Sequence, residues 1–443
     1  MKIDIAAGKI RTATVPSVQV RPPCDSCSNK GSFRDSLKRI RLHLESLSRP
    51  LRIFKINESI ITGKEKYSGA AIKVLYLGET EDSPFLQLGK IYSRGEAAGK
   101  YLNYQFVLDS IYSDYEIVTQ KKNVSALNIQ KRILRRGKEV DLIIADVESC
   151  FFPDIKAAPY LVLPKWIWQK LTLAESWDAI MRNFSKNLRK ELRRILKRGY
   201  QYVVSGSESH FRQFYYEMYL PYTERRFGKL ATPNKSREMQ QGFTGDREIQ
   251  FLLQNEQVVV GVLQKYTRDQ MISVMSAAAD HFTPDMIKGA FTAMDYFGIM
   301  TAFEKGCRSI DFMGSRPFLK DGPFRYKRKW GAAIVECPFP VNDFHFKICN
   351  FNSGVRNFFS NNPIITKRGD QYVGKVLLTQ QATRDNIEYC LKNYTTCGLS
   401  HIEIFCLAGI DDEARETAHV NASRIKLYDI HNSCYPELDF CKL

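Results

Sequence analysis

The chain has 443 residues, of which 44% are hydrophobic and 12% aromatic, so we expect two or three domains with real cores rather than a disordered protein. Its 65 Lys and Arg residues against 48 Asp and Glu residues give a net charge of +17, which attracts phosphates, anionic lipid or nucleic acid. No apolar run reaches the roughly 20 residues that span a bilayer, and the first residues lack the apolar core of a secretory signal. We therefore expect a cytoplasmic protein, or one that works peripherally at the inner face of the membrane.

The 11 cysteines are odd in number and scattered, which argues against a disulfide framework and fits a reducing compartment. Cys24 and Cys27 form the only CxxC pair, and a structural zinc needs four ligands. Cys434, Cys441 and His431 are distant candidates for the remaining ligands. The alternative is a loop with two free thiols, and we expect no metal site.

Residues 1–66 alternate short apolar runs with Pro, Ser and Gly, and are interpreted as an N-terminal extension with one short helix at Ser36–Ser48. Residues 67–160 are interpreted as an α/β domain. The expected order in this domain is strand, helix, helix, strand, at Ala70–Leu77, Tyr104–Ile111, Ser125–Arg136 and Asp141–Val147.

Residues 161–345 carry the most regular pattern of the chain. A strand at Tyr160–Lys170, broken by Pro164, precedes a single basic helix from Ser176, its N-cap, to Gly199. An aromatic helix follows, interrupted at Pro221, and then three strands joined by short turns. The expected elements after the basic helix are Tyr200–Val204, His210–Arg226, Ile249–Leu253, Val258–Lys265, Met271–Ala278, Pro284–Gly306, Ser309–Met313, a loop, and Trp330–Val335.

Residues 346–443 are interpreted as a small C-terminal α/β domain, because short strands and helices alternate there. The expected elements are Gly374–Leu378, Asn386–Cys397, His401–Leu407, Asp412–His419 and Arg424–Tyr428. Neither of the two common glycine-rich phosphate-binding motifs occurs in this part of the sequence.

Three sequence blocks in the central segment occur in a characteristic order: SKNLRKELRRILKRGY (Ser185–Tyr200), AMDYFGIMTAFEKGCRSIDFMGS (Ala293–Ser315) and YKRKWG (Tyr326–Gly331). With these blocks, the segment resembles the FemAB/FemX-like branch of the GNAT superfamily of acyltransferases. The resemblance implies an α/β (α+β) fold with a GNAT-like mixed sheet and flanking helices. The preceding α/β domain would be a second, degenerate GNAT domain, and the C-terminal domain a small appendage.

The resemblance also implies transfer of an activated acyl or aminoacyl group to an amine of a cell-envelope or polysaccharide precursor. The donor would be aminoacyl-tRNA or an acyl thioester, used as a co-substrate with no permanently bound cofactor. Acetyl-CoA enzymes of the superfamily usually carry a glycine-rich loop after the third strand, where this chain reads AAADHFTPDMIKGA. Acetyl-CoA is therefore disfavoured as the donor.

Lys327 lies in the YKRKWG block, at the position of the family's lysine. A fixed ammonium there would stabilise the oxyanion of a tetrahedral intermediate. In a GNAT sheet the fourth and fifth strands diverge and the donor enters between them, so we expect a loop to present Lys327 toward the strand Met271–Ala278. The alternative is a surface lysine in a basic loop, since Arg325, Arg328 and Lys329 surround it.

Further candidates for substrate binding lie on both sides of this lysine. Arg316 and Asp321 stand in the loop after a strand, where Arg316 either clamps a phosphate or carboxylate or merely pairs with Asp321 to order the loop. Aromatic and basic side chains on the helix at 210–226 either bind a ring or pack in the core. The full set of binding candidates is Tyr219, Tyr222, Arg225, Asp321, Tyr326, Arg189 and Arg193.

Eight basic residues with a single acidic one, Glu191, occupy the helix at 182–198. This face is either a solvated surface, a phosphate-binding surface for tRNA or a phosphate-bearing acceptor, or a surface that docks on anionic lipid. The competing function, from a different class, is a non-catalytic GNAT scaffold or RNA-binding protein that uses this helix.

Overall fold

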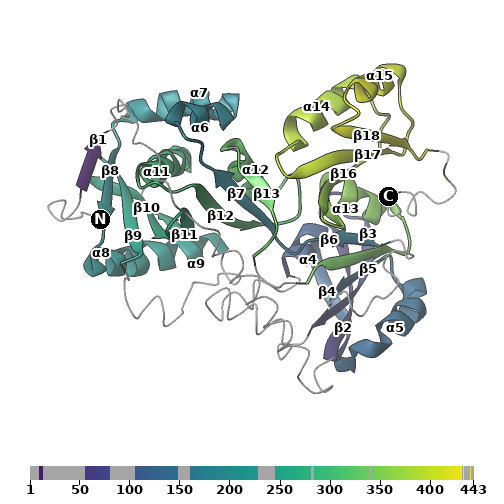
Figure 1. Cartoon of the computed structure of the whole chain (residues 1–443). Coiled ribbons are helices and arrows are strands. Elements are labelled where there is room, and N and C mark those ends of the chain that lie inside the picture. The colour runs from purple at the N-terminus through teal and green to yellow at the C-terminus, as the bar shows by residue number, and fades with distance from the viewer. Residues whose placement is uncertain are drawn as a thin grey trace.

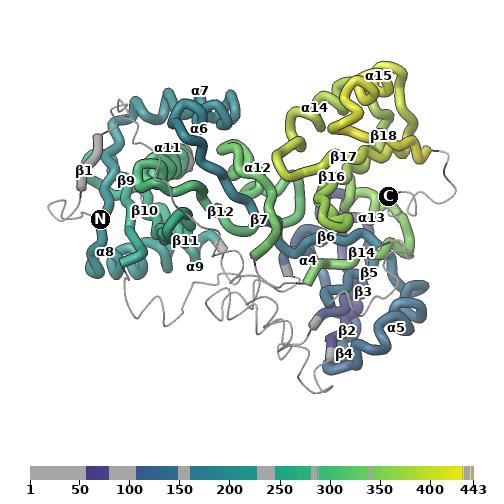
Figure 2. Tube along the Cα trace, viewed as in Figure 1, coloured from purple at the N-terminus to yellow at the C-terminus, as the bar shows by residue number. Residues whose placement is uncertain are grey.

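A computed structural model describes residues 9–12, 55–79, 105–147, 160–227, 245–280, 284–338, 342–431, 433 and 440. The expected helix at Ser36–Ser48 and Cys24, Cys27, Cys434 and Cys441 lie outside these residues. The described strands form sheets of eight, six and four strands, called here the central, N-terminal and C-terminal sheets, each with its own helices (Figure 1). Figure 2 traces the chain through the three corresponding units.

The central sheet has the order β1-β8-β9-β10-β11-β12-β7-β13. Its middle is the expected antiparallel meander, with a parallel strand beside the last member, and this prediction is confirmed. Asn255 and Glu256 form the tight turn with φ of 50° and 62°. The strands are β1 Lys9–Thr12, β8 Gln201–Ser205, β9 Arg247–Gln254, β10 Gln257–Tyr266, β11 Gln270–Ala278, β12 Ser309–Ser315, β7 Ile167–Thr172 and β13 Ala333–Val335.

Strands β11 and β12 pair only at their beginnings. The partners run from Gln270 with Ser309 to Ile272 with Asp311, although β11 continues to Ala278. Just beyond this point the pairing of β12 with β7 is interrupted between Asp311 and Gly314, and Met313 has a φ of 63°. Pairing therefore stops between the two strands where the sequence resemblance led us to expect a gap.

The N-terminal sheet repeats the same succession of neighbours in the order β4-β2-β3-β5-β14-β6. As in the central sheet from β9 to β13, two antiparallel pairs are followed by a parallel pair and then by two antiparallel pairs. Here the parallel strands stay paired through Gly78 and Asp146, so this sheet does not open. The strands are β4 Tyr112–Ser125, β2 Lys55–Glu65, β3 Ala71–Glu79, β5 Leu142–Asp146, β14 Phe344–Ile348 and β6 Leu161–Leu163, with helices α4 Gln105–Ile111 and α5 Ile129–Arg136.

The two units exchange strands. β6 and β7 are separated by a short segment containing Pro164 but belong to different sheets, as do β13 and β14. β6 lies just after the expected domain boundary at 160/161, and β14 spans the one at 345/346. Both strands nevertheless complete the N-terminal sheet. β2 lies entirely within the expected extension at 1–66, and β4 was not expected at all.

Helices cover both faces of the central sheet (Figure 1). α6 Trp177–Asn183, α7 Lys186–Ile195 and α11 Pro284–Glu304 lie on one face. The expectation of one basic helix was wrong, because Ser185 begins a second helix by accepting a hydrogen bond from Leu188 N at 3.2 Å. Ser176 and Gly199 take the expected N-cap and left-handed C-terminal positions.

The other face is covered by a continuous helix in three parts: α8 Glu208–Gln213, the π-helix Phe214–Tyr219 and α9 Leu220–Phe227. The expected interruption at Pro221 is a π-helical stretch just before the proline, which has no backbone N–H to donate within a regular helix.

The segment expected as a loop before Trp330 contains α12 Gly322–Lys329, and only Ala333–Val335 is strand. Asp321 is the N-cap, and Pro323 lies in the first turn, where a proline is tolerated. These two signals were present in the sequence.

The C-terminal sheet has the order β15-β16-β17-β18, and its last three strands are parallel. The expected strand–helix alternation from β16 to β18 is confirmed, whereas β14, α13 and β15 were not anticipated. The elements are α13 Ser353–Asn361, β15 Ile364–Arg368, β16 Gln371–Leu378, α14 Arg384–Tyr394, β17 Leu399–Cys406, α15 Asp412–Val420 and β18 Ile425–Asp429. Within the described residues, no helix is long and apolar enough to cross a bilayer.

Candidate functional site

Lys327 lies on α12 beside the point where β12 leaves β11. Its Nζ donates to the carbonyl oxygens of Met313 at 3.0 Å and Gly314 at 2.7 Å, and to Ser315 Oγ at 3.0 Å. All three donors of the ammonium are thus used at the interruption in β12. The side chain is not in a solvated loop, which was the sequence alternative; it is partly buried and fixed to the strand that precedes Arg316.

Carboxylates approach Lys327 from three elements: Asp295 on α11, Asp311 on β12 and Asp321 at the start of α12. Burial lowers the pKa of Lys327 to about 8, against the opposing effect of these three charges. Burial also raises the pKa of Asp311 and of Asp321. The site therefore holds several charges in a poorly solvated place, which is common at functional sites.

Tyr326, next to Lys327 on α12, donates its hydroxyl to Asp295 Oδ2 at 2.5 Å. Burial raises the pKa of Asp295 to about 6, although the Tyr326 hydrogen bond and the Lys327 charge oppose the shift. Burial and the neighbouring carboxyl raise the pKa of Tyr326 well above its ordinary value. Asp295 can thus exchange a proton near neutral pH while Tyr326 stays a hydrogen-bond donor.

Tyr222 reaches the same surface of α11. Its ring centroid lies 6.2 Å from that of Phe291, which precedes Asp295 by four residues and so by about one helical turn of ~5.4 Å. Tyr222 comes from α9 on one face of the central sheet and Tyr326 from α12 near the opposite face (Figure 1). The structure therefore brings Tyr222, Tyr326 and Lys327 to one side of α11.

Tyr219 and Arg225, on the same helical segment as Tyr222, make different contacts. The Tyr219 ring stacks on Tyr215 with centroids 5.8 Å apart. Arg225 is half exposed and pairs with Asp280 at 2.5 Å, just after the end of β11. The Tyr219 contact lies within its own helical segment, and the Arg225 contact joins this segment to the residues after β11. Neither contact involves Lys327, so substrate binding by Tyr219 and Arg225 remains a prediction.

Arg316 and Asp321 have distinct positions in the loop between β12 and α12. The Arg316 guanidinium lies over the ring of Phe106 on α4, 5.4 Å from its centroid, and so at the junction with the N-terminal unit. Asp321 Oδ2 accepts a hydrogen bond from Phe324 N at 3.0 Å and caps α12. Asp321 thus orders the start of α12 by capping it, whereas the sequence alternative had Asp321 order the loop by pairing with Arg316.

The basic face of α7 lies toward solvent. Arg193 is exposed, whereas Arg189 is partly buried. Glu191 is engaged by Thr292 at 3.3 Å and Lys329 at 3.6 Å, which ties α7 to α11 and α12. The exposed basic residues of this face, called here the basic face, are Arg182, Lys186, Lys190, Arg193, Arg194, Lys197 and Arg198.

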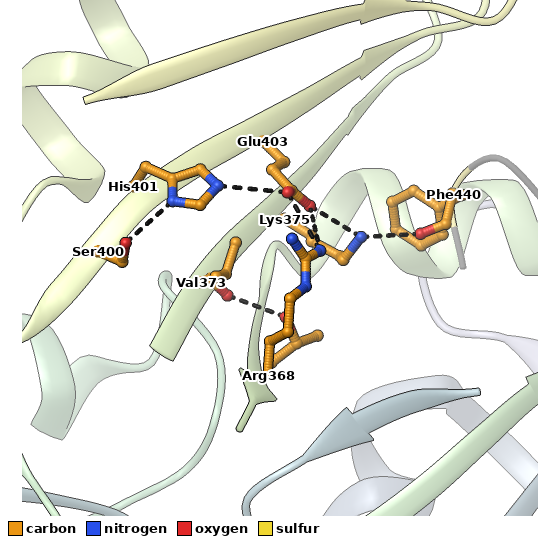
Figure 3. Close-up of polar contacts among 8 residues, drawn as sticks. Arg368, Val373, Lys375, Ser400, His401, Glu403 and Phe440 are labelled. Carbon is orange, nitrogen blue, oxygen red and sulfur yellow. Dashed lines mark hydrogen bonds and ion pairs between the residues drawn. The ribbon is translucent and has the colours of Figure 1, made fainter. Parts of the chain in front are cut away.

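A second polar cluster lies in the C-terminal sheet (Figure 3). Glu403 is fully buried and lies 2.9 Å from Lys375 Nζ, 3.2 Å from Arg368 and 3.3 Å from His401 Nε2. Burial opposes its ionisation, but the two cations hold the pKa of Glu403 below its ordinary value. Lys375 also donates to the carbonyl oxygen of Phe440 at 3.0 Å. The buried carboxylate is paired with two cations, and the cluster joins β15, β16 and β17 to Phe440, so we interpret it as structural.

Asp295, Asp311, Ser315 and Gln169 were not singled out from the sequence. Ser315 Oγ donates to Gln169 Oε1 at 2.9 Å, and Gln169 Nε2 donates to Phe324 O at 3.2 Å, so β7 supports both β12 and α12. A usable signal existed only for Asp295, which is the one charged residue between Lys288 and Glu304 of the helix at 284–304.

No protein-family model matches the sequence, and no curated protein does either. Solved structures with similarity include FemX, at 14% identity and a TM-score of 0.33, covering 66% of this chain and 84% of that chain. Another is the C-terminal domain of a putative lysylphosphatidylglycerol synthetase from Agrobacterium fabrum, at 11% identity and a TM-score of 0.28, covering 72% and 93%. A tandem GNAT protein from the clavulanic acid biosynthesis pathway has 12% identity and a TM-score of 0.23, covering 64% and 81%. Scores this low carry no argument about function, which must rest on the site itself.

Proposed function

We propose that this protein is a GNAT-fold acyl- or aminoacyltransferase whose reaction takes place beside Lys327, where β11 and β12 part. The observation that carries the proposal is the position of Lys327 between the interrupted strand and three carboxylates. Burial lowers the pKa of this ammonium, and ionisable groups perturbed in this way cluster at functional sites.

In the proposed reaction, the amine of the acceptor attacks the carbonyl carbon of the activated donor. Lys327 provides the positive charge that stabilises the oxyanion, and exchanges its bond to Ser315 Oγ for one to the reacting oxygen. The amine would pass its proton to Asp295, whose pKa burial raises to about 6 and whose Oδ2 accepts the hydrogen bond of Tyr326. As the intermediate collapses, the bond between the carbonyl carbon and the leaving oxygen or sulfur breaks, and Asp295 returns the proton to that atom.

The substrates are proposed from the charge pattern and the family resemblance. The donor would be an aminoacyl-tRNA or an acyl thioester, and the acceptor an amine on a phosphate-bearing cell-envelope or polysaccharide precursor. Arg316 would hold an anionic group of the acceptor, and Tyr222 an apolar or ring portion. The basic face, with Arg189 and Arg193, would bind the phosphates of tRNA or of anionic lipid.

The direct test is to purify the full-length protein and identify co-purified small molecules and RNA by mass spectrometry. Recovery of an aminoacyl-tRNA, an acyl thioester or an acylated amine from the wild-type protein, and loss of the acylated amine in Lys327→Met, would support the proposal. The proposal would be wrong if wild-type protein and Lys327→Met yielded the same acylated products at the same rate from those donors.

A second candidate is a non-catalytic GNAT scaffold that binds RNA through the basic face. Two observations favour it: the basic face is exposed, and all three donors of Lys327 are used within the protein. Tight, salt-dependent RNA binding that is unchanged in Lys327→Met, together with no transfer from any donor, would favour this scaffold over the enzyme.

A further inference from the structure

The helix that carries Lys327 lies between the central sheet and the C-terminal unit (Figure 1). Tyr326 and Lys327 point to α11 and β12, as their hydrogen bonds show. Phe324, which is 1% exposed, packs instead in a core shared with Ile387 and Cys390 of α14. One side of α12 therefore forms the candidate site while another is packed against the C-terminal unit.

Arg328 makes the most specific contact on the C-terminal side. Its Nη1 donates to the carbonyl oxygen of Asn393 and, at 3.2 Å, to that of Thr395. Thr395 is the C-cap of α14, whose last carbonyls have no partner within the helix and carry a partial negative charge. The guanidinium of Arg328 thus caps α14 from α12.

The segments on either side of α12 are attached to the same unit. Before the helix, Leu319 N donates to Pro363 O and Ile365 N donates to Pro317 O, each at 2.8 Å. After the helix, Ile334 N donates to Cys397 O at 2.9 Å. Residues 317–334 are therefore fixed to the C-terminal unit before, within and after α12.

We propose that Arg328 is a positioning residue, and that the C-terminal unit serves to hold α12 so that Lys327 stays against the interrupted strand β12. The importance of this positioning for catalysis rests on the proposed function, but the contact of Arg328 with the end of α14 does not. The C-terminal unit is then a support for the active site rather than a separate binding module.

The test measures the titration of Lys327 in the full-length protein. Trace acetylation over a range of pH, read by mass spectrometry of the Lys327 peptide with the other lysines as references, gives its pKa. This value is about 8 in the intact site, where Asp295, Asp311 and Asp321 are the charged groups facing Lys327 from α11, β12 and the start of α12. If α12 loses its support, Lys327 becomes solvated and its pKa rises toward the ordinary value of about 10.4.

Two variants remove the support from opposite sides. Arg328→Ala removes the cap of α14. Gly398→Ala adds a Cβ that would lie 2.3 Å from Ile334 O, at a residue with a φ of +83°, and so pushes the C-terminal unit away from β13. The matched controls are Lys329→Ala on α12 and Gly369→Ala, at a φ of +57° with nothing within 4 Å of the added Cβ.

We expect Arg328→Ala and Gly398→Ala to raise the pKa of Lys327, both controls to leave it near 8, and Arg328→Lys to restore it at least in part. The proposal is overturned if both variants keep near-native circular dichroism and a Lys327 pKa of about 8. Where either fails to fold, Arg328→Gln takes its place in the same comparison. Because labelling requires no substrate, a failed transferase assay leaves this result intact.

Discussion

Lys165 Nζ lies 2.6 Å from Asp146 Oδ1, and both side chains are almost completely buried at the end of the parallel pair in the N-terminal sheet. Tyr76 donates its hydroxyl to the other carboxylate oxygen at 2.9 Å. In the central sheet, the corresponding place is where β11 and β12 part. In the N-terminal unit, an internal ion pair thus lies at the end of two strands that stay paired. In the central unit, the corresponding strands are no longer paired at this place.

The ion pair gives a stability prediction. Lys165→Met leaves the Asp146 carboxylate buried without its cation, so the free energy of unfolding should fall by about 3–5 kcal/mol. Urea denaturation followed by circular dichroism measures this loss. The double variant Lys165→Met, Asp146→Leu should recover most of it, and a loss below about 1 kcal/mol in the single variant would contradict the expected role.

Lys327→Met should lower turnover by ~100-fold or more with little change in substrate affinity, because it removes the charge that stabilises the oxyanion. Steady-state kinetics with the donor identified by mass spectrometry measure both quantities. Lys329→Met is the matched control, since Lys329 lies on the same helix but pairs with Glu191 at 3.6 Å. Equal turnover in the two variants would rule out a catalytic Lys327.

The pH dependence of turnover should be bell-shaped. Asp295 must be ionised to accept a proton, so the rate should rise as pH rises through about 6. Lys327 must be protonated, so the rate should fall as pH rises through about 8. Asp295→Asn should abolish the acidic limb of the profile. An acidic limb that persists in this variant would assign that titration to another group.

Replacing Arg189 and Arg193 with Gln should weaken binding to the anionic partner and reduce the slope of log affinity against log salt by at most about two. The free energy of unfolding should change little, because the charge of the exposed Arg193 contributes little and Arg189 is only partly buried. Filter binding or fluorescence anisotropy over a salt series measures the slope. The control is Lys131→Gln with Arg135→Gln on α5, which removes two exposed charges from the N-terminal unit; an equal loss there would indicate a non-specific effect.

The buried His345 should make the free energy of unfolding depend on pH. Burial lowers its pKa from the ordinary 6.5 to about 4, so the unfolded chain takes up a proton first as the pH falls. The free energy of unfolding should therefore fall by about 3 kcal/mol as the pH is lowered from 6.5 to 4. Denaturant unfolding at several pH values measures the slope, and His345→Phe should flatten it whatever its effect at neutral pH.

The sequence predicted local elements well where side-chain periodicity and turn chemistry agree. The meander with its Asn255–Glu256 turn and the parallel strands of the C-terminal sheet follow from such local signals. The break in the basic helix was missed because apolar spacing continues through it, whereas the backbone N–H of Ser185 donates to Lys329 O at 2.8 Å, a partner far away in sequence.

The candidate site was only partly predictable. Lys327 and Tyr326 could be selected because a motif contains them, but their hydrogen-bond partners come from two other elements, α11 and β12. Asp295 gains its role from Tyr326, and Lys327 from the carbonyl groups of Met313 and Gly314. The left-handed backbone at Met313 has no residue-type signature, since methionine rarely adopts it.

A repeat of the central unit in the N-terminal unit was expected from the family resemblance alone, because the residues of the two units show no sequence repeat. The two sheets share an order of strand directions, which depends on backbone pairing and tolerates unrelated side chains. In addition, β6 and β7 follow one another along the chain but enter different sheets, so the repeat is not arranged as two consecutive segments.

The strand exchange has a consequence for synthesis on the ribosome. β14, Phe344–Ile348, pairs with β5 on one side and with β6 on the other, so β6 has no neighbour in its sheet until β14 has been made. By then the whole central unit has also been synthesised. During synthesis, β5 should therefore keep an unpaired edge until the central unit has emerged from the ribosome. The N-terminal sheet is completed only then, so the two units depend on each other for folding.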